Sequence, residues 1–169
     1  MKKILSIVVT LLFLWNCSSD PCKDITCLNN GVCVEGICDC ADWYEGLNCE
    51  TERRDKYFGD FLGIMTRVEQ GSTYTNPTTC NLSKDSKGVS FLLLDNLLSL
   101  ELIKEQQIEL DGRAEFNIPL VLFTDPDNGD SNYFTGSGLF IGTSTFEFDL
   151  TATNIDGTVA YIMSFEGSR

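Results

Sequence analysis

Apolar and polar residues alternate at every second position through most of the chain from residue 56 onward. In 144–154, Phe146, Phe148, Leu150 and Ala152 fall on one face of an extended chain, and acidic residues and threonines fall on the other. Such alternation is typical of β-strands with one buried face. It predicts strands near 58–69, 78–82, 89–95, 98–104, 106–110, 113–123, 132–141 and 144–154, and a ninth near 158–166.

Turn and bend signals separate these segments. Asp111-Gly112 and Asp156-Gly157 predict hairpin turns, and Pro119 predicts a sheet edge or a bulge. Gly136 and Gly138 share a face, which suits a strongly bent strand. Because the strands are closely spaced and no helix separates them, the pattern favours an antiparallel sandwich or an up-and-down barrel.

The start of this β region carries a short motif. Tyr57-Phe58-Gly59-Asp60-Phe61, followed by a predicted strand, is similar to the opening of lipocalin-like domains. The resemblance implies a lipocalin-like antiparallel barrel or sandwich over residues 56–169. The charged run 50–55 is expected to join it to the preceding segment with almost no spacer, and the leucines within 92–98 leave a short helix open as an alternative to a strand.

The N-terminus has the pattern of an export signal. Lys2 and Lys3 precede an apolar run of 12 residues, 4–15, which spans about 18 Å as a helix and is too short for a hydrocarbon core of about 30 Å. The run ends Leu14-Trp15-Asn16-Cys17, which resembles a bacterial lipoprotein signal, although small residues are usual at the two positions before the cysteine. The alternative is an ordinary secretory signal with Cys17 in a disulfide.

The lipoprotein resemblance implies a specific maturation. Residues 1–16 would be removed, and Cys17 would become the first residue and carry lipid, palmitate included, ahead of a tether over 17–21. The residue after the cysteine is Ser18 and not Asp, which in the lipoprotein family disfavours retention in the inner membrane. We therefore expect an exported protein anchored to the outer membrane, at the cell surface, with a secreted protein as the alternative.

Six cysteines lie between residues 22 and 49 with the spacing C-x4-C-x5-C-x4-C-x-C-x8-C. In an exported chain this density predicts three disulfides rather than a zinc site, and spacing alone allows fifteen pairings. A module of about thirty residues depends on such bonds because its apolar core is small. Glu35-Gly36 predicts a hairpin turn between two of the cysteines.

The cysteine pattern resembles an EGF-like module over residues 22–50. The stretch Cys27-Leu28-Asn29-Asn30-Gly31-Val32-Cys33 and the closing Cys40-Ala41-Asp42-Trp43-Tyr44-Glu45-Gly46-Leu47-Asn48-Cys49 are close to the family's two motifs, with Asn30 and Trp43 at positions where glycine is usual. The resemblance implies the pairs Cys22–Cys33, Cys27–Cys38 and Cys40–Cys49. Residues 18–21 supply a single carboxylate before the first cysteine, so we expect no calcium site.

The composition of the chain limits which partners it can bind and which catalytic or metal-binding groups it can form. The chain has 12 Lys plus Arg against 25 Asp plus Glu, a formal net charge of −13 and no histidine. This charge argues against nucleic acid as a partner, and the lack of histidine excludes a Ser-His-Asp triad and histidine-ligated metal. We expect no enzyme activity, no cofactor and no metal.

Three features remain as weak candidates. Glu147 and Asp149 share a strand face about 6.6 Å apart by strand rise, a carboxylate pair that could hydrolyse glycosides but is better explained as the wet face of a strand. The acidic stretch 125–132 departs from an EF-hand loop and is expected to be a solvated hairpin loop. Cys80 is left over from the six and is expected to be a half-buried thiol, unless it pairs with Cys17.

These features resemble a group of small bacterial lipoproteins with one EGF-like module and a lipocalin-like β domain. The prediction is a non-enzymatic cell-surface lipoprotein, in which the module is a stalk and the β domain binds or adheres to an extracellular protein or glycan. The alternative is a carrier with an apolar cavity lined by Phe116, Phe146, Phe148 and Tyr161.

Overall fold

The structure is a computed structural model that describes residues 20–96, 105–112, 114–124 and 129–169. The expected signal peptide, Cys17, the predicted strand 98–104 and half of the acidic stretch 125–132 lie outside the described residues. The described chain divides into two compact units, one ending at Glu50 and one running from Thr51 to Arg169. None of the described helices is long and apolar enough to cross a membrane.

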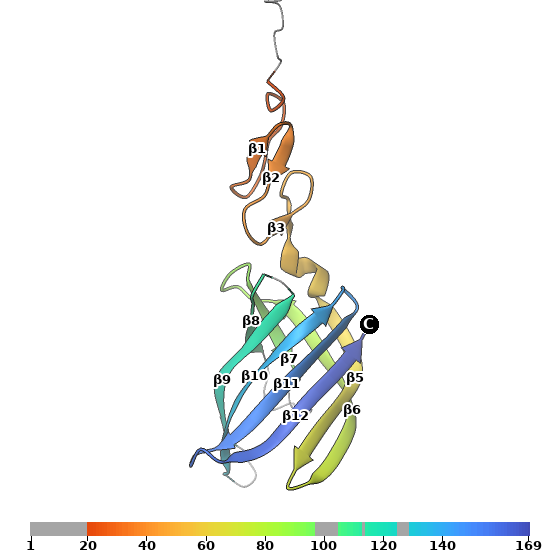
Figure 1. Cartoon of the computed structure of the whole chain (residues 1–169), viewed down its shortest axis with the longest axis vertical. Helices are drawn as coiled ribbons and strands as arrows, with labels where there is room; N and C mark the ends of the chain where they lie inside the picture. Colours follow the sequence, from red (N-terminus) through yellow and green to blue (C-terminus); the bar gives the residue numbers. More distant parts are fainter. Residues whose placement is uncertain (1–19, 97–104, 113, 125–128) are drawn as a thin grey trace, which may run out of the picture. The chain divides into compact units, whose positions relative to one another are not determined.

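The first unit is a small disulfide module (Figure 1). Strands β1 (Val32–Val34) and β2 (Ile37–Asp39) form a hairpin in which Val34 pairs with Ile37, so Glu35 and Gly36 make the predicted turn. Strand β3 (Tyr44–Glu45) follows. Asn30 and Trp43, which stand where the EGF-like motifs have glycine, both have positive φ, 63° and 74°, so the glycine conformation is kept without the glycine.

The second unit is mainly β. A short strand and a short 3-10 helix precede eight strands of 5 to 13 residues in the described chain. In chain order the elements are β4 (Thr51–Glu52), η1 (Arg53–Tyr57), β5 (Gly59–Glu69), β6 (Ser72–Lys84), β7 (Phe91–Asp95), β8 (Gln106–Leu110), β9 (Glu115–Thr124), β10 (Ser131–Ile141), β11 (Thr145–Asn154) and β12 (Val159–Ser168). The leucines of β7 therefore form a strand and not a short helix.

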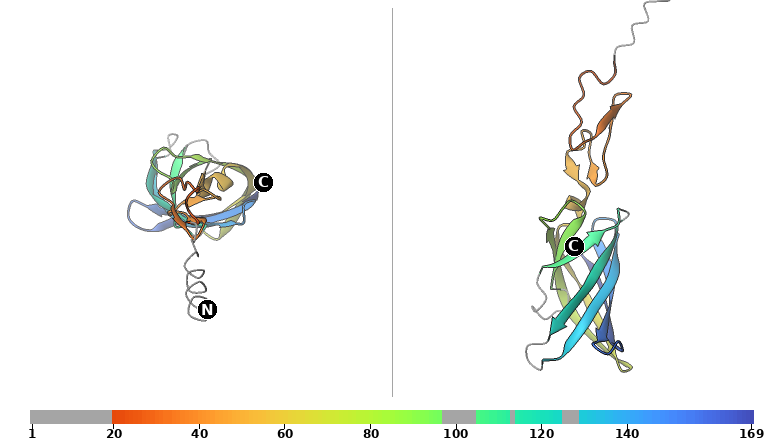
Figure 2. Two further views of the ribbon diagram at one scale, coloured as in Figure 1. Left: turned by 90° about the horizontal axis from the view of Figure 1, so that it is seen from above. Right: turned by 90° about the vertical axis from the view of Figure 1, so that its left-hand side faces the viewer.

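Strands β5 to β12 form a closed antiparallel barrel in chain order, with β12 paired to β5 (Figure 2, left). The fold is therefore an up-and-down barrel, as predicted, and not a sandwich. A register shift opposite Thr135 places a bulge at Pro119, and the turn at Asp156-Gly157 is closed by a backbone hydrogen bond from Gly157 to Asn154, 2.9 Å. Both features match the sequence signals.

Aromatic side chains fill the barrel next to η1. The rings of Phe61, Phe116, Phe140 and Phe165 surround Phe146 at centroid distances of 4.8 to 6.1 Å. All five rings are at most 3% exposed. Together with the leucines of β6, β7 and β8 they form the hydrophobic core, which provides most of the stability of such a domain.

The helix η1 closes this end of the barrel. Tyr57 is buried and its ring stacks on Phe140 with centroids 4.0 Å apart. Arg169 holds the segment from the other end of the chain, because its guanidinium donates to the carbonyls of Lys56 (2.6 Å) and Phe58 and lies 5.1 Å from the ring of Phe61.

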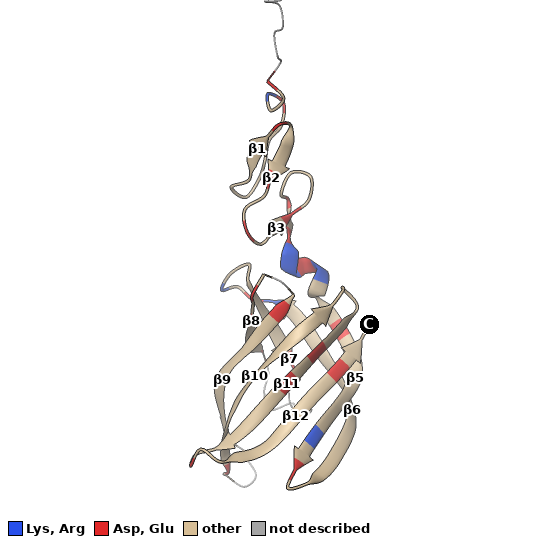
Figure 3. Cartoon of the chain, in the orientation of Figure 1, with Lys and Arg blue, Asp and Glu red and all other residues tan. Residues whose placement is uncertain are grey.

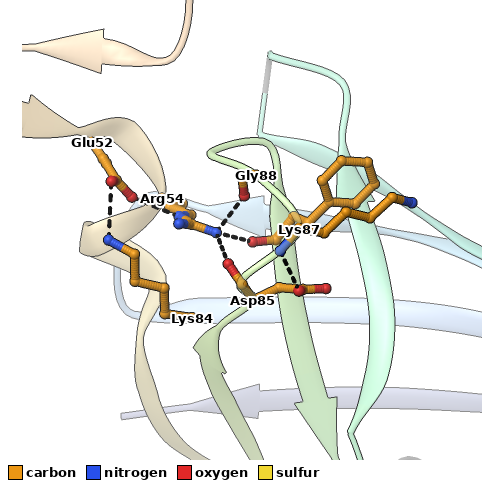
Figure 4. Close-up of polar contacts among 7 residues, drawn as sticks. Glu52, Arg54, Lys84, Asp85, Lys87 and Gly88 are labelled. Atoms are coloured by element: carbon orange, nitrogen blue, oxygen red, sulfur yellow. Dashed lines mark hydrogen bonds and ion pairs between the residues drawn. The ribbon is translucent and has the colours of Figure 1, made fainter. Parts of the chain in front are cut away.

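Arg54 fixes η1 to the rest of the barrel (Figure 4). Its side chain is 2% exposed, and Nη1 donates to the carbonyls of Asp85 (2.8 Å), Gly88 (2.5 Å) and Phe91 (2.6 Å). Its Nε pairs with Glu52 at 2.8 Å, and Glu52 also pairs with Lys84 at 2.9 Å. The charged run 50–55, which we expected to be a short junction with almost no spacer, therefore also contains a buried anchor.

Candidate functional site

The residues singled out in the sequence are distributed over both units. The six cysteines form Cys22–Cys33, Cys27–Cys38 and Cys40–Cys49, the pairs that the EGF-like resemblance implies. Cys17 lies outside the described residues. In the part of the chain that the structure describes, no group of three Asp, Glu or Cys side chains is arranged to hold a metal ion.

Cys80 is more deeply buried than the sequence suggested. It lies on β6 with no exposed surface, among the core side chains, and its thiol is free. Burial raises the pKa of this thiol to about 12. A thiol with such a pKa is fully protonated at neutral pH and is a poor nucleophile, which agrees with the structural role expected for it.

The carboxylate pair lies on the outer wall of the barrel. Glu147 and Asp149 of β11 line a shallow cleft of about 280 Å³ together with Asp111, Glu115, Asn117 and Ser137. Figure 3 shows that acidic positions recur on β9, β11 and β12 in this half of the wall. The pair is part of a wider solvent-facing acidic surface.

A larger cavity opens at the opposite end of the barrel from η1, the lower end in Figure 1. It has a volume of about 660 Å³, within the range of small-molecule sites. The ends of β5 and β9, the start of β10 and the β11–β12 turn surround it. Its lining is Arg67, Glu69, Phe123, Gly129, Asp130, Ser131, Asn132, Asn154, Ile155, Asp156, Ala160 and Tyr161. We call this the mouth cavity.

Arg67 is the central polar side chain of the mouth cavity. It lies on β5, two residues beyond the buried Met65, and therefore faces into the barrel. Its Nη2 pairs with Glu69 at 2.6 Å, and its guanidinium carbon lies 3.9 Å from the ring centroid of Tyr161. These two contacts hold the guanidinium in place, because a paired, stacked arginine has little freedom to rotate.

Two residues of this lining each have a buried polar atom without a hydrogen-bond partner among the described residues: Nε of Arg67, a donor, and Oδ1 of Asn132, an acceptor. Buried polar atoms without a partner are rare in folded proteins and each costs about 1–3 kcal/mol. Arg67 on β5 and Asn132 on β10 both belong to the lining of this one cavity, which makes it the candidate binding site of the barrel.

The electrostatic balance of the mouth cavity is negative. Glu69, Asp130 and Asp156 line it, and Arg67 is the one basic residue of the described lining. Hydrogen bonds from the side chain and backbone of Thr158 hold the pKa of Asp156 below its usual value, so this carboxylate is charged at neutral pH. Phe123 and Tyr161 add aromatic surface, and each packs edge-on against the buried Phe134 at 6.2 and 6.0 Å.

Sequence reasoning passed over the mouth cavity. Arg67 occupies an inward position in the alternation that runs through Phe61 and Met65. A charged residue on this otherwise apolar face is a sequence signal that could have predicted a polar site inside the barrel. Asn132 ends the acidic stretch 125–132, which the sequence predicts to be a solvated hairpin loop and not a binding site. Tyr161 was expected to line an apolar cavity with Phe116, Phe146 and Phe148; these three phenylalanines are instead buried in the core.

Comparison with known proteins adds a fold relationship. No protein-family model and no curated protein matches the sequence. A solved structure from Nostoc punctiforme, a protein of unknown function from the DUF3598 family, is similar at 13% identity with a TM-score of 0.50 over 69% of this chain and 49% of that one. A putative outer membrane protein from Bacteroides fragilis matches at 11% identity with a TM-score of 0.44, over 68% of this chain and 52% of that one.

The similarity to the Nostoc punctiforme structure supports the fold alone. The chain spans about half the length of each solved structure that it matches. The class defined by the described residues is therefore a disulfide-rich module followed by a closed eight-stranded antiparallel barrel with a polar cavity at one end.

Proposed function

We propose that this chain is an exported, lipid-anchored binding protein whose barrel takes up a ligand in the mouth cavity. The observation that carries the proposal is the mouth cavity itself, with a buried donor on Arg67 and a buried acceptor on Asn132 that have no hydrogen-bond partner in the described part of the chain. The opposite end is closed by η1 through Arg54 and Tyr57. One end of the barrel therefore contributes stability and the other is available for binding.

The proposed location rests on the N-terminal module and on the preceding residues. Three disulfides in a module of this size are typical of oxidising compartments outside the cytoplasm. Lipid on Cys17 would anchor the chain to the outer membrane, and the EGF-like module would act as a stalk. Intact mass of membrane-extracted protein should show residue 17 as the first residue with acyl chains attached, and Cys17→Ser should release the protein from the membrane fraction.

The polar lining favours a polar ligand over the apolar ligand of the alternative prediction. Of the four aromatic residues expected to line an apolar cavity, Tyr161 lines the mouth cavity, and one face of its ring is covered by Arg67. An extracellular protein or a glycan remains the class of partner proposed for the barrel, with nucleic acid disfavoured by the net charge of −13.

Binding at the mouth cavity is tested by filling it. Asn154 lines the mouth cavity and Asn117 lies on the outer wall, so Asn154→Trp and Asn117→Trp are a matched pair. In a thermal-shift screen of polar small molecules on the full chain, we expect compounds that stabilise the native protein and Asn117→Trp but not Asn154→Trp. Equal stabilisation of both variants would place the ligand elsewhere.

We also propose that the barrel performs no chemistry. The carboxylates of Glu147 and Asp149 belong to a solvent-facing wall, and the chain offers no histidine as an alternative general base. The double variant Glu147→Gln, Asp149→Asn should change the free energy of unfolding by about 0.5 kcal/mol or less per site. Glycosidase activity in the native chain that disappears in this variant would overturn the proposal.

A further inference from the structure

The two unpartnered atoms of the mouth cavity define what a ligand must offer. The N–H at Nε of Arg67 requires an acceptor, and Oδ1 of Asn132 requires a donor. A hydroxyl group is both at once, whereas a carboxylate or a phosphate only accepts and an ammonium only donates. A ligand with several hydroxyl groups can therefore satisfy both atoms with one kind of functional group.

The charges that line the mouth cavity limit the class of ligand further. Three carboxylates line the mouth cavity, and its arginine is already neutralised by Glu69 at 2.6 Å. An anionic ligand would meet a negative field, because the described lining residues include no second cation to compensate for it. The same carboxylates accept hydrogen bonds well and cost nothing electrostatically against a neutral ligand, so a neutral polar molecule is favoured.

The aromatic lining fits the same ligand. Phe123 lines the mouth cavity and is half-buried, with its edge against Phe134 at 6.2 Å. A rigid, partly exposed aromatic ring offers a flat apolar platform, and the C–H face of a pyranose ring is a flat apolar surface of matching size. Hydroxyl groups at the rim of such a ring then reach carboxylate and amide side chains.

We infer that the mouth cavity binds an uncharged saccharide, held by hydrogen bonds to Arg67 Nε and Asn132 Oδ1 and by stacking on Phe123. This inference rests on the proposed function and names its ligand class. The cavity of about 660 Å³ is open at one side, which suits either a free short oligosaccharide or the non-reducing end of a longer glycan; soluble and immobilised probes distinguish the two.

The test uses the full chain on an array of neutral glycans, with uronate-containing and sulfated glycans as anionic probes and polyamines as cationic probes. Neutral glycans should bind and the charged probes should not. Asn132→Ala and Arg67→Lys, which remove the acceptor and the Nε donor, should each weaken binding by roughly tenfold. Asn117→Ala on the outer wall is the matched control and should bind as the native chain does. Near-UV circular dichroism checks that the variants fold.

The outcomes separate the two proposals. Binding of anionic or cationic probes in place of neutral glycans, lost in Asn132→Ala, would overturn the saccharide inference and leave the cavity as a binding site. Neutral glycan binding that is unchanged in both Asn132→Ala and Arg67→Lys would place the saccharide outside the mouth cavity and overturn the inference. If cavity-filling Asn154→Trp also leaves all binding unchanged, the proposed function fails with it.

Discussion

Replacing Arg54 should weaken the closed end of the barrel more than any surface substitution. Arg54→Met keeps most of the side-chain volume and removes all of its hydrogen bonds. The carbonyls of Asp85, Gly88 and Phe91 then lose a charged donor that lies 2.5 to 2.8 Å away, and Glu52 loses one of its two cationic partners. The damage is confined to the segment that ties η1 to β6 and β7.

The size of the effect follows from burial. A buried carbonyl without a hydrogen-bond donor costs about 1–3 kcal/mol. Water that enters at this end would bond to some of the three carbonyls and so reduce the total cost. Loss of one partner from a buried ion pair costs about 3–5 kcal/mol. We therefore expect Arg54→Met to lower the free energy of unfolding by about 3–5 kcal/mol and the melting temperature by roughly 10–20 °C.

The measurement is thermal and urea unfolding of the full chain followed by far-UV circular dichroism, without reductant so that the disulfides stay closed. Both tryptophans, Trp15 and Trp43, precede the barrel, so tryptophan fluorescence cannot report on it. Arg53→Met is the matched control because Arg53 is the exposed neighbour, and it should change stability by about 0.5 kcal/mol or less. Equal effects of the two variants would refute the role of Arg54.

Three further predictions concern the barrel. Burial acts to raise the pKa of Glu52, but hydrogen bonds from Lys84 and Arg54 outweigh it, so the pKa is lowered in the folded chain. The charged Glu52 therefore stabilises the fold above its ordinary pKa of 4.5, and this stabilisation is lost as the pH falls through the folded pKa. Glu52→Gln should make the free energy of unfolding depend less steeply on pH in that range. Cys80 should resist a thiol reagent at pH 8 in the folded chain and react at once in denaturant, and rapid labelling of the native protein would contradict its burial. Gly138→Ala should cost about 1–3 kcal/mol because the new Cβ meets the ring of Phe116, whereas Gly88→Ala, whose Cβ would be in ordinary contact at 3.6 Å, should change stability little in the same unfolding assay.

Most strand positions could be predicted from the sequence because alternate side chains of a barrel strand point into the apolar interior and out to solvent. In β11 and β12 the alternation is regular, and the predicted segments match the strands closely. In β6 the prediction covered 78–82, whereas the strand begins at Ser72. The segment 72–77 is exposed at every residue, so no buried face imposes an alternation there, and Pro77 also argued against a strand.

Closure of the barrel and the burial of Arg54 could not be predicted from local sequence patterns. The pairing of β12 with β5 joins strands about a hundred residues apart in the chain, and period-two alternation is identical in a barrel and a sandwich. Arg54 stands in a run of charges that normally faces water. Its burial depends on carbonyls from 85–91, and nothing in the local sequence encodes that contact.

The two ends of the barrel differ in whether the buried polar atoms of their arginines have partners, and this contrast leads to a last prediction. At the η1 end, the guanidinium of Arg54 has carbonyl and carboxylate partners and stabilises the fold. At the mouth cavity, Arg67 Nε and Asn132 Oδ1 lack partners and reduce stability in the unliganded chain. Functional sites commonly carry such a cost, which stabilising substitutions relieve at the expense of activity.

Asn132→Leu should therefore leave the melting temperature unchanged or raise it, because it removes an unpartnered acceptor from a half-buried position. It should weaken glycan binding by roughly tenfold, as expected for Asn132→Ala. Arg54→Met should do the opposite, lowering the melting temperature while the remaining folded protein keeps its affinity. Melting temperature and glycan affinity measured on the same two preparations decide the matter. If Asn132→Leu lowers the melting temperature as far as Arg54→Met does, Asn132 is a structural residue, and the mouth cavity loses the feature that distinguishes it as a binding site.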